Sequence, residues 1–318
     1  MTPPTDLTPP DGGPDETDDE ADGLAPACVL VFNANDPSGS GGLSSDVTAV
    51  ASVGAHALPV VTGSYARDTT EITDHFAFDD EAVSEQARTI LEDVVVQVIK
   101  VGFVGSPENI SAIAQIATDY EDLPLVAYMP DLSWWTDHQI DDYLDAFKEL
   151  LLPQTTVLAG NHSTLRRWLL PDWDGAKTPT ARDIARAANE LGVPYVLVTG
   201  IALADQFIDN VLATPESVLA SEKFERFEAV FSGAGDTLTA ALAAVLASGT
   251  ALPEAVKEAL GYLDRSLNAG FRPGMGHVIP DRLFWAQSDD DEDDDNSQDD
   301  DRQLAKMIFD LPAPDTKH

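Results

Sequence analysis

Two short segments of this 318-residue chain combine small residues with acids in a way that suits phosphate chemistry. The first, residues 231–237 (FSGAGDT), precedes a long alanine- and leucine-rich run that is typical of a helix. Small residues at a helix N-terminus let backbone N–H groups converge on an anion, and the helix dipole favours negative charge there. Asp236 could then accept a proton from a hydroxyl beside this anion hole. A plain helix cap made by Asp236 or Ser232 would use the same residues.

The second segment, residues 33–42 (NANDPSGSGG), follows an apolar run and is itself followed by Asp46. Its glycines would let a ligand approach the backbone closely, although a turn with ordinary helix capping has the same composition. The spacing matches neither the G-x-G-x-x-G of dinucleotide-binding folds nor the Walker loop G-x-x-x-x-G-K-[ST]. Neither of those two nucleotide sites is predicted.

Short apolar runs alternate with helical patterns around these two loops. Strands are predicted at residues 28–32, 57–64, 96–104, 125–128, 155–159 and 194–199, and helices at 43–53, 81–95, 137–152, 163–170, 180–191, 235–248 and 253–269. Two more short strands, 207–214 and 225–231, have hairpin-like spacing. Strands separated by helices are typical of right-handed βαβ units and a mostly parallel sheet. We therefore predict one α/β domain, whose ligands bind beyond the carboxyl ends of the strands.

The charge of the chain restricts its partners. Fifty-six acids stand against 18 lysines and arginines, a formal net charge of −38. Nucleic acids and anionic membrane surfaces require a local basic stripe, and the bases here are scattered, so neither partner is predicted. No apolar run approaches the length of a membrane span, and the N-terminus does not resemble a secretory signal. A single cysteine fits a reducing compartment, and we expect a cytoplasmic protein.

The acids are concentrated near both ends of the chain. Residues 1–23 contain eight acids and no base, and residues 289–301 contain ten acids in thirteen positions. Such segments bury too little apolar surface to offset the entropy of ordering. We predict a disordered acidic tail at 1–23, a folded domain at 24–288, and an acidic, mostly disordered tail at 289–318.

Several motifs, taken in order, resemble a known kinase family. These are DPSGSGGLSSDV (36–47), SYARDTT (64–70), KVGFVGS (100–106), GAGDTL (233–238) and the C-terminal AGFRPGMG and PDRLFWA (269–276 and 280–286). They are similar to the hydroxymethylpyrimidine/phosphomethylpyrimidine kinases of thiamine biosynthesis over about residues 28–287. The resemblance implies a ribokinase-like fold, a three-layer α/β/α arrangement with a mostly parallel central sheet. It also implies a homodimer and the ATP- and Mg²⁺-dependent phosphorylation of 4-amino-5-hydroxymethyl-2-methylpyrimidine, or of its phosphate.

The resemblance also implies roles for single residues. Asp236 would be the general base, at a position where these kinases usually have cysteine, and an anion hole would be formed by Gly233, Ala234 and Gly235. Asp46 matches the acid that reads the polar edges of the pyrimidine ring. The substrate would be bound by Ala34, Asp46, Arg67, Gly102 and Phe103, and the nucleotide by Asn161, Thr199 and Gly200.

Three departures from the family pattern bear on activity. Arg67 replaces the substrate-contacting glutamine, which would disfavour the aminopyrimidine or favour an anionic ligand. The acid of the V-L-D-P segment is missing from residues 128–130 unless Asp131 substitutes for it, and the glutamate of N-x-x-E is Thr164. With both magnesium-organising acids lost, no metal ligand is assigned. The alternatives are a catalytically degenerate ligand-binding paralogue, acting as a sensor or dimer partner, and a ribokinase-like kinase with a different substrate.

Other residues are given structural roles. Trp134 and Trp135 follow a predicted strand, and both are expected to pack against the core or a lid. The histidines have no metal-ligand spacing. Arg282 is expected to make ion pairs that seal the fold.

Overall fold

The computed structural model describes residues 25–286, so the two predicted acidic tails lie outside the described residues. The described residues up to Arg282 belong to one compact unit, and a second unit begins at Leu283. The described part of the second unit is a turn of 3-10 helix, Phe284–Ala286 (η4). The division of the chain into one folded domain with two tails stays a prediction.

A single sheet runs through the first unit, with strand order β3-β2-β1-β4-β5-β6-β7-β8-β9. Its strands are β1 Cys28–Asn35, β2 His56–Arg67, β3 Ile72–Ala77, β4 Val98–Val101, β5 Leu125–Met129, β6 Val157–Asn161, β7 Tyr195–Ala202, β8 Phe207–Ala213 and β9 Val218–Glu225. The strands from β2 to β7 in this order pair in parallel, while β3, β8 and β9 pair antiparallel. Strands such as β1 are near-continuous apolar runs because helices cover both faces.

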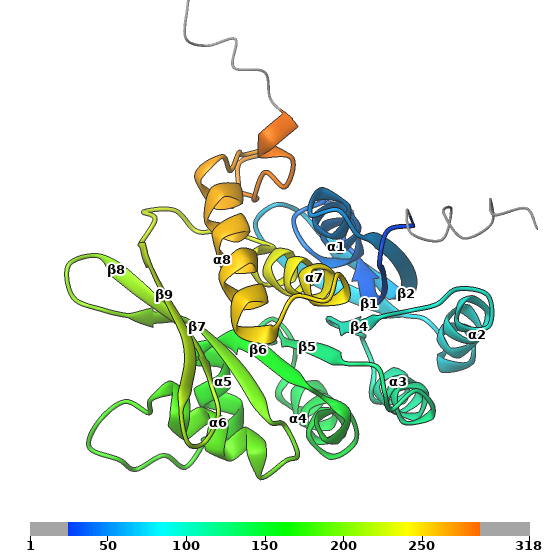
Figure 1. Cartoon of the computed structure of the whole chain (residues 1–318), viewed down its shortest axis with the longest axis horizontal. Coiled ribbons are helices and arrows are strands. Elements are labelled where there is room, and N and C mark those ends of the chain that lie inside the picture. Colours follow the sequence, from blue (N-terminus) through cyan, green and yellow to red (C-terminus); the bar gives the residue numbers. More distant parts are fainter. Residues whose placement is uncertain (1–24, 287–318) are drawn as a thin grey trace, which may run out of the picture. The chain divides into compact units, whose positions relative to one another are not determined.

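Helices form a layer on each face of this sheet (Figure 1). One layer contains α1 Gly42–Ser52, α7 Ala234–Ala247 and α8 Leu252–Asn268. The other contains α2 Asp80–Leu91, α3 Pro107–Asp119, α4 Asp137–Ala146, α5 His162–Leu169 and α6 Ala181–Asn189. A π-helical turn, Phe147–Leu151 (η2), and a 3-10 turn, Leu152–Gln154 (η3), extend α4. The predicted α/β/α layers with a mostly parallel sheet are confirmed. No helix of the described range 25–286 is long and apolar enough to cross a membrane.

Two elements at the ends of the sheet differ from the prediction. β3 was not predicted, because its sequence ITDHFA is largely polar and the strand is an exposed edge. The strand predicted at 225–231 is wrong: the second strand of the hairpin is β9, and after Glu225 the chain continues as a loop up to the isolated bridge at Phe231. The apolar alternation of that loop produces packing instead, since the rings of Phe227 and Phe231 lie 5.5 Å apart.

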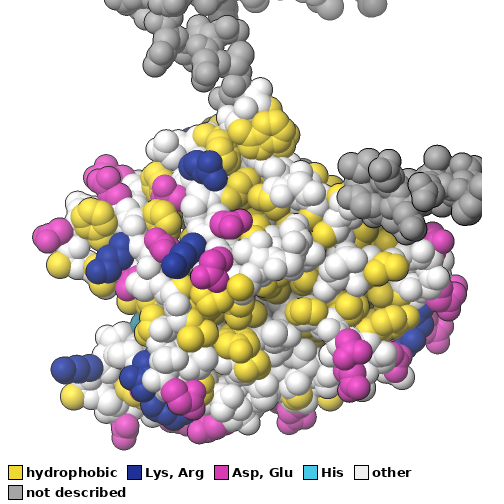
Figure 2. Space-filling model, viewed as in Figure 1, with side chains coloured by type: hydrophobic (Ala, Val, Ile, Leu, Met, Phe, Trp, Pro, Cys, Tyr) yellow, Lys and Arg dark blue, Asp and Glu magenta, His cyan; other side chains and the backbone are white. Residues whose placement is uncertain are grey.

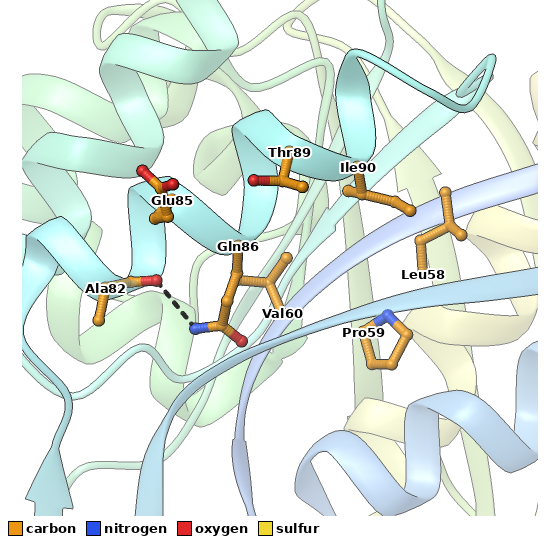
Figure 3. A pocket seen from close by; sticks show the side chains of 8 residues that line it. All are labelled: Leu58, Pro59, Val60, Ala82, Glu85, Gln86, Thr89 and Ile90. Carbon is orange, nitrogen blue, oxygen red and sulfur yellow. Dashed lines mark hydrogen bonds between the residues drawn. The ribbon is translucent and has the colours of Figure 1, made fainter.

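A side chain replaces a neighbouring strand along part of β2. β3 pairs only with residues 63–67 of β2, so the earlier part of β2 faces α2. There the Gln86 amide accepts a hydrogen bond from the Val61 N–H at 3.1 Å and donates one to the Val61 carbonyl at 3.2 Å. Pro59, two residues earlier, has no N–H to leave unpaired. A groove remains between β2 and α2, but its strand edge is largely satisfied (Figure 3).

Charged side chains are mixed on the surface. On the face drawn in Figure 2, lysines and arginines are interspersed with acids and apolar groups.

Candidate active site

The fold brings the two glycine-rich loops together at the carboxyl ends of the central strands. The segment 36–41 connects β1 to α1, and residues 231–233 lead into α7. Asp236, on the first turn of α7, bonds to Asn33 of β1 and to the backbone of Gly42 at the start of α1. The two loops therefore meet at the edge of the sheet where the sequence predicts the site, and the site itself stays a prediction.

Two glycines determine how the chain enters α7. Gly233 is the N-cap of α7 and has φ +86°, and a β-carbon there would overlap the Ser40 carbonyl. A β-carbon at Gly235 would overlap the ring of Tyr128. No side chain caps α7, so the plain cap that the sequence also allowed is not formed. The first N–H groups of this helix are therefore suited to an anion.

Asp236 is held by three donors. Its Oδ1 accepts hydrogen bonds from Asn33 Nδ2 at 2.9 Å and Lys100 Nζ at 3.0 Å, and its Oδ2 accepts one from the Gly42 N–H at 2.9 Å. Burial acts to raise the pKa of this carboxyl, but the Lys100 ammonium and the three hydrogen bonds outweigh burial, so the pKa lies below its ordinary value. Asp236 is thus an ionised carboxylate at neutral pH, the state that a general base requires.

Asp46 lies behind Asp236 and is completely buried. Both of its oxygens are 2.8 Å from Lys100 Nζ, and Oδ2 also accepts a hydrogen bond from Asn33 Nδ2 at 2.7 Å. Burial raises the pKa of Asp46 to about 7; Lys100 opposes the rise and the charge of Asp236 adds to it. Substrate reading by Asp46 stays a prediction, and in this structure its carboxylate is occupied by the protein's own donors.

Two arginines fasten the glycine-rich loops to each other. Arg67 forms an ion pair with Asp36 at 3.2 Å and donates to Ser232 Oγ at 3.0 Å, so the positive charge of Arg67 already has a carboxylate partner. Arg282 donates to Thr237 Oγ1 at 2.9 Å, to the Gly39 carbonyl at 3.2 Å and to the Ser40 carbonyl. Arg282 therefore seals the loops through a hydroxyl and two carbonyls, where ion pairs were expected.

The other predicted substrate residues surround Asn33 and an aromatic cluster. The Ala34 N–H donates to the Phe103 carbonyl at 3.0 Å, and the Asn33 amide fills the space that a side chain at Gly102 would need. The Phe103 ring stacks on Tyr65 with centroids 5.4 Å apart. It also meets the edges of two half-buried tryptophans, whose predicted packing is confirmed: Trp134 at 5.6 Å and Trp135 at 5.0 Å.

The predicted nucleotide residues lie farther along the same edge of the sheet. Asn161 ends β6 and pairs with Thr199 of β7, and the Asn161 side chain caps α5 by accepting from the Ser163 N–H at 3.0 Å. Gly200 has φ +68°, and a β-carbon there would crowd the Asn161 amide. These three residues lie together at the ends of β6 and β7. In the sheet, β5 lies between β6 and β4, the strand that contains Lys100.

The acids that would organise Mg²⁺ do not assemble. Thr164 is buried in α5, and exposed Asp131 accepts from the Ser133 N–H and pairs with Arg167 at 3.4 Å. Across residues 25–286, no group of three or more His, Cys, Asp or Glu side chains is placed to hold a metal ion. The residues present in this range do not fit a Mg²⁺ site made by protein side chains alone.

Lys100 is the site residue that sequence reasoning missed. It is fully buried in β4, and its ammonium contacts both Asp46 and Asp236. The sequence contained one signal for this role, a single lysine inside the apolar strand VIKV. A lysine buried in such a strand requires acidic partners, which could have been sought among the nearby acids.

Comparisons with known proteins identify the family of this chain. The family model for phosphomethylpyrimidine kinase matches residues 36–281. A hydroxymethylpyrimidine/phosphomethylpyrimidine kinase of Mycobacterium bovis is 29% identical over 266 residues, which cover 82% of this chain and 96% of the relative. A relative of the same name from Streptomyces coelicolor is 27% identical over 258 residues, covering 80% and 93%.

The solved structures agree on the fold. An ADP complex of Bacillus subtilis pyridoxal kinase is similar with a TM-score of 0.73 at 22% identity, covering 83% of this chain and all of that one. The ribokinase-like fold and the predicted family resemblance are thereby confirmed. The chain belongs to the phosphomethylpyrimidine kinase family.

Proposed function

We propose that this protein is an ATP-dependent kinase of thiamine biosynthesis that phosphorylates the hydroxymethyl group of 4-amino-5-hydroxymethyl-2-methylpyrimidine, or the phosphate of its monophosphate. Family membership and the names of the curated relatives support this substrate class. The observation that carries the proposal is the Asp236 carboxylate, 3.0 Å from the Lys100 ammonium, beside the uncapped N-terminus of α7. A binding protein without turnover has no need of a base in that place, so the degenerate paralogue is not favoured.

The reaction uses the site as follows. The γ-phosphoryl group of ATP lies against the N–H groups of residues 234–236, whose dipoles stabilise its developing charge. The substrate hydroxyl transfers its proton to Asp236 while its oxygen bonds to the γ-phosphorus. The bond from that phosphorus to the β,γ-bridging oxygen breaks, and ADP leaves. Arg282, whose hydrogen-bond partners are a hydroxyl and two carbonyls, adds positive potential around the same loop.

The proposal also includes the nucleotide-binding residues, the cellular location and the oligomeric state. Asn161, Thr199 and Gly200 would contact the nucleotide from the ends of β6 and β7. The protein would work in the cytoplasm as a homodimer on a small-molecule substrate. Size-exclusion chromatography with light scattering measures the oligomeric state, and a monomer at micromolar concentration would contradict the dimer.

Turnover on a substrate panel tests the function. Purified protein is given MgATP with hydroxymethylpyrimidine, its phosphate, pyridoxal or simple sugars, and ADP release is followed. We expect turnover on the two pyrimidines. A ligand-induced rise in melting temperature without turnover on any substrate would refute the kinase and favour the binding protein. Turnover on pyridoxal alone would refute the substrate.

The two pyrimidine substrates also test the base. The hydroxymethyl group must lose a proton, whereas the acceptor oxygen of the monophosphate is largely ionised above about pH 6. Asp236→Asn should therefore slow the first phosphorylation far more than the second. Equal losses on both substrates would count against proton transfer to Asp236.

A further inference from the structure

We propose that Lys100, together with Asp46, is a positioning residue for Asp236: it occupies one carboxylate oxygen and leaves the other, Oδ2, to take the substrate proton. This inference rests on the proposed kinase function and explains how the same site holds its base in place.

The lysine is fully engaged by acids. Its three N–H donors are matched by three contacts, to Asp46 Oδ1 and Oδ2 at 2.8 Å each and to Asp236 Oδ1 at 3.0 Å. Lys100 and Asp46 are completely buried, so the ammonium is not solvated by water in place of these partners. One side chain thus ties β4 to α1 and to α7. Because a cation in an apolar strand is costly without close partners, this geometry is strongly held.

Counting acceptor sites separates the two oxygens of Asp236. A carboxylate oxygen accepts about two hydrogen bonds in its plane. Oδ1 already receives Asn33 Nδ2 and Lys100 Nζ, so it has no further capacity. Oδ2 receives only the Gly42 N–H and keeps one acceptor site. The substrate hydroxyl is therefore directed to Oδ2.

No side chain at Gly41 covers the same oxygen. A β-carbon there would stand 3.0 Å from Asp236 Oδ2, 3.5 Å from the Gly233 Cα and 3.7 Å from Asp36 Oδ2. Only a residue without a side chain therefore leaves this side of Oδ2 uncovered.

Asn33 completes the holder. Its Nδ2 donates to both acids, and its Oδ1 accepts from the N–H groups of Ala34 at 2.9 Å and Phe103 at 3.2 Å. The amide orientation is set by these partners, because the flipped amide would place its oxygen against two carboxylates. Asp236 therefore meets a fixed amide and a fixed ammonium on its Oδ1 side.

The electrostatic surroundings of Asp236 determine what removal of the lysine does. The titratable and charged groups facing it are Lys100 from β4, Asp46 from α1, Tyr65 from β2, Tyr128 from β5, Arg282 after α8, and Asp36 of the β1–α1 loop, which is itself paired with Arg67. Burial raises the pKa of both tyrosines, so they stay neutral at physiological pH, and arginine stays cationic. Without Lys100, two buried carboxylates would share one amide, and the pair would bind a proton more tightly.

The test compares pH–rate profiles of the wild type, Lys100→Met and the double variant Lys100→Met with Asp46→Asn. In Lys100→Met the acidic limb of kcat should move up by about one to three pH units. The double variant has the same formal buried charge as the wild type, so its limb should return toward that of the wild type. Its kcat should stay at least tenfold low with KM changed less than twofold, because Asp236 has lost its Oδ1 anchor.

Each result decides the matter. A folded Lys100→Met variant whose profile superimposes on that of the wild type would overturn the proposal. If the single variant does not fold, the double variant carries the test, and wild-type kcat in it would overturn the proposal equally. If the wild type turns over no substrate, the proposed function fails, and a ¹³C-carboxyl NMR titration still tests the positioning. The pKa of Asp236 should then lie below its ordinary value in the wild type and rise in Lys100→Met, and an unchanged pKa would refute the role of Lys100.

Discussion

Arg67 joins two loops that must stay together for the site to exist, and its replacement by glutamine has a calculable effect. The variant loses a charge-assisted hydrogen bond to Asp36 and a second one, from the same guanidinium, to Ser232. Hydrogen bonds to charged groups contribute about 1.5–3 kcal/mol each. The Asp36 carboxylate remains bonded to Ser38, Ser40 and the Gly41 N–H, so it is not left bare. We therefore expect a loss near the lower limit for the two bonds, about 3 kcal/mol.

Urea unfolding and melting curves measure this loss directly. For a domain of this size, about 3 kcal/mol corresponds to a fall in melting temperature of roughly 6–12 °C. Arg88→Gln is the matched control, because Arg88 also pairs with an aspartate, Asp119 at 2.7 Å, but on the surface. Surface pairs contribute little, so the control should change much less. If Arg67→Gln is no more destabilising than Arg88→Gln, Arg67 does not fasten the loops. A gain of activity on hydroxymethylpyrimidine in Arg67→Gln would show that the arginine also sets substrate choice.

Three further predictions concern the same site. Asp236→Asn should lower kcat for the hydroxymethyl substrate by about 10²–10⁴, with Asp119→Asn as the unaffected control, and an unchanged rate would remove the base. Gly41→Ala, whose backbone (φ −136°) suits alanine, should lower kcat about tenfold, because the added carbon would stand 3.0 Å from Oδ2. Gly261→Ala, with no atom within 4 Å of the added carbon, should not lower it, and equal kinetics in the two variants would contradict proton transfer to Oδ2. Folding raises the pKa of Asp46 to about 7, so the folded state binds the proton of this carboxyl more tightly than the unfolded state does. The free energy of unfolding, compared with that of Asp46→Asn, should therefore fall as pH rises from about 4 to about 7. Urea unfolding across that range checks the slope, and a pH-independent difference would refute it.

The central fold could be predicted because its signals are local. The parallel strands are buried on both faces, and runs such as CVLVF and PYVLVT are therefore almost wholly apolar. β3 escaped prediction because an edge strand with one exposed face and polar residues has no such run. At residues 225–231 the error was the opposite one. Alternating apolar residues predicted a strand, but they pack against each other within a loop.

The residues of the candidate site also differ in whether the sequence could predict them. The anion-hole loop and Asp236 are contiguous in sequence, so a motif could identify them. Lys100 bonds to acids 54 and 136 residues away, and no spacing rule gives that register. The ionisation of Asp236 likewise depends on which strand brings the ammonium, which follows from the sheet order. The motif could predict a candidate base, and the three-dimensional packing determined its partners.

The pairing of Lys100 with Asp46 also bears on how freely position 236 can vary. Asp46 and Lys100 form a charge-balanced pair within the first third of the chain, so the buried ammonium keeps a carboxylate partner whatever residue α7 contributes. The chemistry at 236 is thereby separable from the stability of its surroundings. Position 236 can therefore change during evolution, for example between aspartate and cysteine, without leaving the buried Lys100 ammonium unpaired in the core.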